Sequence, residues 1–111
     1  MPTILPVDIN GNPIPAIRLK DGGAHAISVT ATSARNSTAF DSETELVSLY
    51  ATGPVYVKFG DSAVSATTSD HYFPAGIYYD FAIGGDGSKQ YTHVAVLRAD
   101  TDCTLYVSEK E

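Results

Sequence analysis

The sequence predicts an all-β protein built as an antiparallel sandwich or barrel. From His25 onward, apolar residues alternate with polar ones at a period of two, which is typical of half-buried strands. The expected strands are short, rich in Val, Ile, Thr and Tyr, and separated by clusters of Gly, Pro and Asp. No window of ten residues combines a 3.6-residue period with helix caps.

Chain length and charge limit what the protein can be. A chain of 111 residues with 43% hydrophobic residues fits one domain with a real core. The formal charge is −6, and the seven Lys and Arg residues are scattered, which argues against a nucleic-acid partner. No apolar run approaches the roughly 20 residues of a membrane span, and the start MPTILPVDI lacks the basic region of a signal peptide. We therefore expect no membrane partner and a cytosolic site of synthesis.

Residues 1–22 are predicted to form an extended arm ahead of a single β domain at 23–111. Four prolines between positions 2 and 15 exclude both a helix and a central strand, because each fixes φ and lacks a backbone donor. A turn is expected at Asn10-Gly11. The arm is also apolar, through Ile4, Leu5, Val7, Ile9 and Ile14. An extended apolar arm needs a surface to lie against, either its own domain or another chain, and the sequence leaves both open.

The strands follow in order from residue 25. Segment 25–34 places Ile27, Val29 and Ala31 on one face. Segment 46–51 is mixed. The predicted faces further along are Val55, Val57 and Phe59 in segment 55–60; Ile77, Tyr79, Phe81 and Ile83 in segment 77–83; His93, Ala95 and Leu97 opposite Val94 and Val96 in segment 91–99; and Leu105 with Val107 in segment 103–109.

The connections carry turn signals. Phe73-Pro74-Ala75-Gly76 predicts a type I turn, with Pro at its second position and Gly at its fourth. The Gly-rich segment 84–89 is expected to be a hairpin loop. Segment 33–45 is the longest polar interval, and we expect it to be a surface loop or to hold a short helical turn.

Metal chemistry finds little support. His25, His71 and His93 are not spaced as paired ligands on one strand, and His93 is expected to be a half-buried imidazole with its hydrogen bonds satisfied. The loop at 84–88 holds one carboxylate, whereas a calcium site needs several oxygen ligands. We predict no metal site.

Catalytic and cofactor motifs are equally scarce. There is no Gly-x-Ser-x-Gly and no phosphate loop. Cys103 falls in an expected strand and is predicted to be a small buried residue. Asp61 and Asp70 are expected to cap turns, and pairing either with Asp80 would need tertiary contacts. We therefore predict no catalytic or cofactor-binding residues and no enzymatic activity; a small hydrolase or cupin-like enzyme remains the hypothesis that a bound metal would favour.

Part of the chain resembles small virion structural proteins of tailed phages. The resemblance covers about residues 53–108 and rests on VYVKFGD at 55–61, FPAG at 73–76 and LYV at 105–107, the last in an expected final hairpin. With the length, the acidic balance and the Pro-rich arm, the chain is most similar to the capsid decoration, or staple, proteins of epsilon-fifteen-like short-tailed phages. That resemblance implies a jelly-roll-like domain on the outer capsid surface, paired as a dimer at two-fold positions, that clamps neighbouring major capsid subunits against DNA pressure. It also implies a virion protein assembled in the bacterial cytoplasm.

The residues expected to contact the capsid or a second copy come from the arm and from exposed aromatic side chains. They are Ile4, Leu5, Val7, Ile9, Ile14, Tyr56, Tyr72, Phe73 and Tyr78. An alternative hypothesis is a carbohydrate- or receptor-binding module of a phage tail or fibre. In that case exposed aromatics such as Tyr56, Tyr72, Tyr78 and Tyr106 would stack on sugar rings, although the chain has no Trp.

Overall fold

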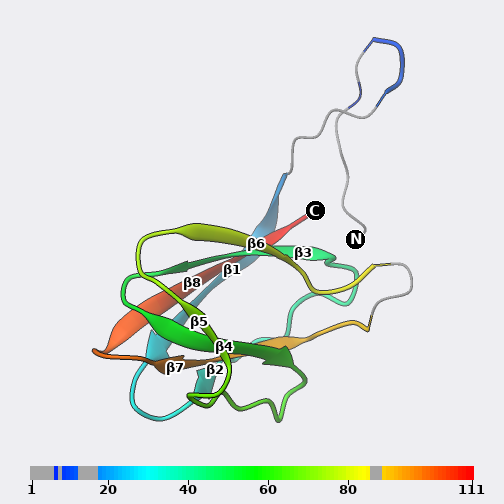
Figure 1. Ribbon diagram of the computed structural model, residues 1–111. Helices are drawn as coiled ribbons and strands as arrows, with labels where there is room; N and C mark the ends of the chain where they lie inside the picture. Colours follow the sequence, from blue (N-terminus) through cyan, green and yellow to red (C-terminus); the bar gives the residue numbers. More distant parts are fainter. Residues whose placement is uncertain (1–6, 8, 13–17, 86–88) are drawn as a thin grey trace.

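The chain folds into two facing antiparallel sheets of four strands each (Figure 1). The computed structural model describes residues 7, 9–12, 18–85 and 89–111. The first sheet has the order β1-β8-β3-β6 and the second the order β2-β7-β4-β5. The strands are β1 (Leu19–Val29), β2 (Ala34–Arg35), β3 (Leu46–Ala51), β4 (Val55–Gly60), β5 (His71–Phe73), β6 (Tyr78–Ala82), β7 (His93–Arg98) and β8 (Cys103–Lys110). The prediction of an antiparallel all-β sandwich is confirmed.

Strand pairing is nested. β1 pairs with β8, β2 with β7, β3 with β6 and β4 with β5, and the contacts β3–β8 and β4–β7 complete the sheets. Only the connection from β4 to β5 therefore joins neighbours in one sheet. The expected hairpin at 84–89 is wrong, because this segment carries the chain from β6 in the first sheet to β7 in the second. For the same reason β7 and β8 do not form a final hairpin.

The core lies between the sheets, where the predicted alternation places its apolar residues. Ile27 and Val29, Val55 and Val57, and Leu105 and Val107 are buried as expected; Val47, Leu49, Val94 and Val96 complete the central strands. Ala31 and Ile77 are exposed instead, because each lies just outside its strand. Described residues include no helix long and apolar enough to cross a membrane.

Segment 36–44 closes one end of the sandwich. The expectation of a surface loop at 33–45 holds for most of its side chains, which are exposed, whereas Asn36, Phe40 and Thr44 are buried and no part of the segment is helical. Phe40 is only 3% exposed and belongs to the core. Asn36 is buried: its Oδ1 accepts a bond from the Val94 N–H (2.8 Å), and its Nδ2 donates to the Thr38 carbonyl (2.7 Å). Side chains thus satisfy the polar groups that burial of a loop would leave unpaired.

The two sheets differ in what covers their outer faces. On the second sheet, Val64 and Ala66 from the connection after β4 pack with Ala95 and Leu97 of β7. No such packing cluster occurs among the described residues on the outer face of the first sheet. Among the described residues, Tyr78 and Tyr106 of this outer face are therefore exposed.

The arm meets the domain at β1. Leu19 pairs with Lys110, the register then shifts before Ala24, and the Arg18 carbonyl accepts a bond from the Glu111 N–H (2.9 Å). Leu19 to Gly22, assigned to the arm from the sequence, thus lie within β1. The expected turn at Asn10-Gly11 is present, with Gly11 at φ 80°, and Figure 1 shows it well away from both sheets.

Candidate functional site

Three tyrosines form a row across the outer face of the first sheet, which we call the tyrosine face. Tyr50 of β3 lies opposite Tyr106 of β8 on one side and Tyr78 of β6 on the other. The Tyr50 and Tyr78 ring centroids are 4.8 Å apart. The rings point outward because their strand neighbours Leu49 and Leu105 point into the core. Tyr78 is 73% exposed and Tyr106 is 49% exposed.

The side chains around this row of tyrosines are small and mostly uncharged. The neighbouring outward positions are Ala24, Ala26, Ser28, Ser48, Asp80, Thr104 and Ser108. Asp80 is the carboxylate among them, and its Oδ1 accepts a bond from Ser48 Oγ (2.5 Å). A mostly uncharged face with exposed tyrosines is typical of protein contacts, where an aromatic ring supplies apolar area and its hydroxyl a hydrogen bond.

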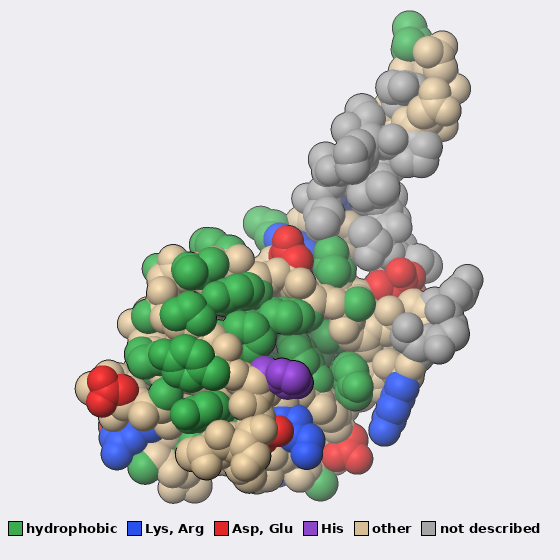
Figure 2. All heavy atoms as spheres, viewed as in Figure 1, with side chains coloured by type: hydrophobic (Ala, Val, Ile, Leu, Met, Phe, Trp, Pro, Cys, Tyr) green, Lys and Arg blue, Asp and Glu red, His purple; other side chains and the backbone are tan. Residues whose placement is uncertain are grey.

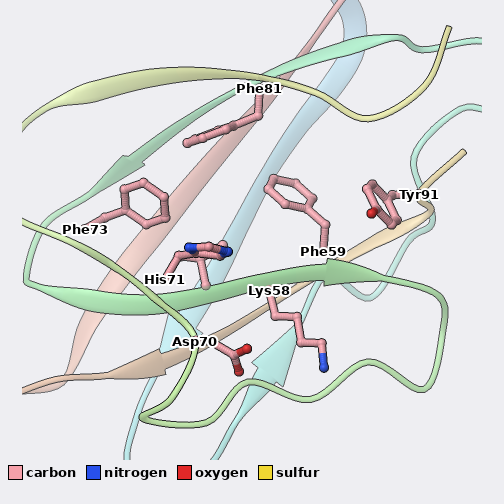
Figure 3. Close-up of a pocket in the computed structure, with 8 residues that line it drawn as sticks. Lys58, Phe59, Asp70, His71, Phe73, Phe81 and Tyr91 are labelled. Carbon is pink, nitrogen blue, oxygen red and sulfur yellow. The ribbon is translucent and has the colours of Figure 1, made fainter. Parts of the chain in front are cut away.

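A pocket of about 450 Å³ opens between the edge strands β5 and β6, and we call it the mouth pocket. It is lined by Val57, Lys58, Phe59, Asp70, His71, Phe73, Phe81 and Tyr91. Its walls are aromatic: Phe81 lies 5.3 Å from Phe73 and 5.8 Å from Phe59 between ring centroids, and Phe59 lies 6.0 Å from Tyr91. Figure 3 shows His71 between Phe73 and Phe59. Figure 2 shows hydrophobic side chains gathered around a hollow on this side of the molecule.

Polar groups at the mouth pocket are few. Asp70 belongs to a turn, since its Oδ2 accepts bonds from the N–H (2.6 Å) and the hydroxyl (3.2 Å) of Thr67. Figure 3 shows Lys58 and Asp70 on the side of β4 away from the aromatic rings. The His71 side chain is exposed, and its ring makes no hydrogen bond within the described part of the chain. The pocket is thus an apolar slot with one free imidazole.

Asp61 and His93 serve separate local structures. Asp61 caps a turn by accepting a bond from the Ala63 N–H (2.9 Å), so the capping roles expected for Asp61 and Asp70 are both confirmed. His93 is buried, and its Nδ1 lies 2.8 Å from Thr92 Oγ1, as expected for a satisfied imidazole. Within the described ranges, no three His, Cys, Asp or Glu side chains lie together as a metal site would require.

A buried carboxylate, which the sequence did not reveal, closes the end of the sandwich near the arm. Glu109 is 4% exposed, and its Oε1 accepts bonds from the Asp41 N–H (2.9 Å) and Thr44 Oγ1 (2.8 Å). Its Oε2 lies 2.8 Å from His25 Nε2. A hydrogen bond from the Glu43 N–H lowers the pKa of the neighbouring Asp41 carboxyl. This cluster ties β1, β8 and segment 36–44 together, and all its groups are used internally.

The predicted contact residues fall into separate places. Tyr78 lies on the tyrosine face, whereas Tyr56 and Tyr72 form a pair on the outer face of the second sheet, with ring centroids 5.7 Å apart. Phe73 is partly buried and lines the mouth pocket. In the arm, Val7 and Ile9 are exposed, Ile9 completely. Ile4, Leu5 and Ile14 lie outside the described residues.

Two parts of the site could not be found from the sequence. Tyr50 sits in a segment with a mixed pattern, and only the pairing of β3 with β6 and β8 places it between Tyr78 and Tyr106. The mouth pocket combines residues that are far apart in the chain, from Val57 to Tyr91.

Comparison with known proteins adds no relative: no family model matches the chain, and neither a curated protein nor a solved structure matches it significantly.

Proposed function

We propose that this chain is a non-enzymatic structural protein that binds to an assembled protein surface. The observation that carries the proposal is the row of three tyrosines on an uncovered and nearly uncharged sheet face. A second apolar surface, at Val7 and Ile9 of the arm, is also uncovered. Two modest contacts made by one chain reinforce each other, because the first raises the effective concentration of the second.

The resemblance to phage decoration proteins supplies the partner in this proposal. The assembled surface is then the exterior of a phage capsid, and the partner is the major capsid protein. A protein that binds the assembled shell but not free subunits stabilises the shell by mass action, which would hold the head against DNA pressure. The nested strand pairing supports the finer assignment of the sandwich as a jelly roll.

Self-association as a dimer on the capsid is part of the same proposal. Each chain carries a formal charge of −6, so two copies repel wherever their acidic surfaces meet. The tyrosine face avoids this cost, because its side chains are mostly neutral. It is therefore suited to contact either a second copy or the capsid.

Co-sedimentation with shells assembled from the major capsid protein of the same virus tests the proposal. We expect the chain to sediment with shells at a fixed number of copies per subunit. Replacing Tyr78 and Tyr106 by Ser should weaken attachment about tenfold or more, because exposed aromatic anchors carry much of the energy of an interface. Tyr72→Ser distinguishes the two sheets, because Tyr72 is also an expected contact but lies on the second sheet: a loss of attachment with Tyr72→Ser alone would place the contact there. Absence of attachment by the unaltered chain would refute the proposal.

A second candidate function rests on the exposure of Tyr78. A ring that is 73% exposed beside a second tyrosine at 4.8 Å also offers a platform for a sugar ring, as a tail or fibre module would need. Binding on a glycan array that is lost with Tyr78→Ala would favour this candidate. Silence on a broad array together with attachment to shells would exclude it.

A further inference from the structure

We infer that β6 accepts an extended segment of a partner protein as an added strand, and that one large apolar side chain of this segment fills the mouth pocket. The inference deepens the proposed function, on which it rests for the partner being a protein. Two independent observations support it: the state of the β6 edge and the position of the pocket beside that edge.

Among the four edge strands formed by the described residues, β6 is the least protected against strand pairing. The β1 edge carries a register shift between Leu19 and Ala24 together with the charges of Lys20 and Asp21. β2 has two residues, and β5 has three and leads directly into Pro74. β6 has five residues, an unshifted register, and neither Pro nor Lys, and its one charged residue is Asp80. Native proteins normally block such an edge, because its unpaired backbone groups recruit another strand.

The backbone groups available on β6 can be identified from its ladder. Ile83 donates its N–H to the Glu45 carbonyl (2.8 Å) at the end of the pairing with β3. Hydrogen-bonded and non-hydrogen-bonded pairs alternate along an antiparallel ladder. The peptide groups of Tyr78, Asp80 and Ala82 therefore point to the opposite edge, where the described sheet has no further strand.

The mouth pocket lies where a side chain of the added strand would point. Successive side chains of a strand alternate between the two faces of a sheet, so every second residue beyond β6 would enter the gap between the sheets. There it would meet Phe81 of β6 and, across the gap, Phe73 and His71 of β5. A slot of about 450 Å³ has room for an aromatic or large aliphatic side chain. Backbone pairing with one side-chain pocket is the usual chemistry of strand addition.

Electrostatic repulsion disfavours pairing of β6 with β6 of a second copy of this chain. Two copies that pair β6 with β6 bring together molecules with a formal charge of −6 each. In the register centred on the middle of β6, Asp80 would face the same carboxylate of the other copy, and like charges directly opposite destabilise a sheet. Pairing of β6 with β6 of a second copy is therefore disfavoured, and the occupant assigned to this edge is a different chain that is extended and apolar at alternate positions.

Peptide probes test the site on the full-length protein by NMR titration. The probes are blocked nonapeptides in which Thr alternates with one apolar residue, in four versions carrying Phe, Tyr, Leu or Ile, with a terminal Lys for solubility. At least one version should shift the amide signals of Tyr78, Asp80 and Ala82 and the ring signals of Phe73 and Phe81. No shift with any version, or shifts confined to other strands, would overturn the inference.

Two pairs of variants locate the binding. His71→Trp fills the pocket, whereas Tyr72→Trp places the same ring on the opposite face of β5. Ala82→Pro removes an N–H from the free edge, whereas Ala82→Ser keeps it. The first member of each pair should weaken the best probe about tenfold and the second less than about twofold. Equal binding by His71→Trp and Tyr72→Trp would overturn the inference, even if Ala82→Pro did not fold.

Shell attachment by the same variants separates this inference from the proposed function. If the unaltered chain and His71→Trp attach to shells equally well, the proposed function stands and strand addition at β6 fails as its mode of contact. If the unaltered chain does not attach but binds the probes at β6, the capsid proposal fails and the site stands.

Discussion

At the scale of single residues, Glu109 connects the groups at the closed end of the sandwich. Its two carboxylate oxygens accept or share hydrogen bonds with Asp41, Thr44 and His25, and the side chain is almost completely buried. No buried side-chain nitrogen or oxygen in the described part of the chain lacks a partner. Removing this one acceptor therefore leaves several buried donors unsatisfied at once.

We predict that Glu109→Ala lowers the free energy of unfolding by about 3 kcal/mol. A buried donor left without an acceptor costs more free energy than a typical hydrogen bond contributes. Urea denaturation followed by circular dichroism measures the change. Glu111→Ala is the matched control: Glu111 pairs with an exposed Arg18 at 3.5 Å, and such surface pairs contribute less than about 1 kcal/mol. Equal midpoints for the two variants would contradict this role of Glu109.

Cys103 provides a prediction on pH dependence. Burial raises the pKa of its thiol above the ordinary value of 9.0, and the nearby Asp102 adds to the rise, although a backbone hydrogen bond from Gly53 opposes it. Since the raised pKa favours the protonated thiol in the folded state, the associated stability is complete below 9.0 and is lost as the pH rises through the folded pKa.

Alkylation by iodoacetamide should therefore be slower for the folded chain than for the urea-unfolded chain at about pH 8, because the thiolate is the reactive form. The folded rate should keep rising as the pH passes 9.0. Mass spectrometry follows the single addition, and Cys103→Ser, which removes the one cysteine of the chain, gives the blank. A folded rate equal to the unfolded rate would show that the thiol is not shielded.

At the scale of elements, segment 36–44 acts as a lid on the core although it has no regular secondary structure. Phe40 inserts into the core, its N–H donates to the Thr92 carbonyl (2.9 Å), and its ring meets the His25 ring edge-on at a centroid distance of 5.2 Å. The lid thus connects β1 with the start of β7.

We predict that Phe40→Ala destabilises the protein by about 3–5 kcal/mol, the usual cost of deleting a buried phenyl ring. Phe40→Leu should cost less than half as much, because it leaves a smaller cavity. Thermal unfolding of the three proteins under identical conditions measures the series. A loss below about 1 kcal/mol for Phe40→Ala would mean that the Phe40 ring contributes little to the core.

The same segment illustrates what sequence patterns can and cannot predict. Strands from Ile27 to Val29 and from Val55 to Val57 were predictable because local alternation alone decides which face is buried. Burial of Phe40 was not, because it depends on bonds between this loop and distant strands: the Val94 N–H donates to Asn36 Oδ1, and the Asp41 N–H donates to Glu109 Oε1. The turn after Phe73 was placed correctly, but it centres on Ala75 and Gly76, with Gly76 at φ 79°, which differs from a type I turn ending at Gly76.

The candidate site was less predictable than the strands for a related reason. Exposure of Tyr78 follows from its place in β6, but the row with Tyr50 and Tyr106 exists only because β3 lies between β6 and β8. That order results from nested pairing between strands far apart in the sequence. A pattern of period two specifies the faces of a strand and carries no information on its neighbours.

At the scale of the whole molecule, the arm and the sandwich have different roles in the proposed function. The described residues extend over 51 × 27 × 24 Å, and the turn at Asn10-Gly11 lies away from the sheets (Figure 1). The described core residues all lie from Ile27 onward. Stability is therefore expected to reside in the sandwich, and the arm is expected to add reach and apolar contact.

Deleting residues 1–17 should leave the melting temperature nearly unchanged while weakening attachment to shells. The cut leaves Arg18, whose carbonyl accepts the Glu111 N–H, and the pairing of Leu19 with Lys110, so the junction with the sheet keeps its hydrogen bonds. Attachment should fall about tenfold or more, because one of the two linked contacts is lost and with it the gain in effective concentration. Differential scanning calorimetry and co-sedimentation measure the two effects on the same samples, with substitution of Val7 and Ile9 by Ser as a variant that keeps the full length. If the truncated chain folds and attaches as well as the intact one, the arm does not contribute to attachment, and the contacts are made by the sheet surfaces.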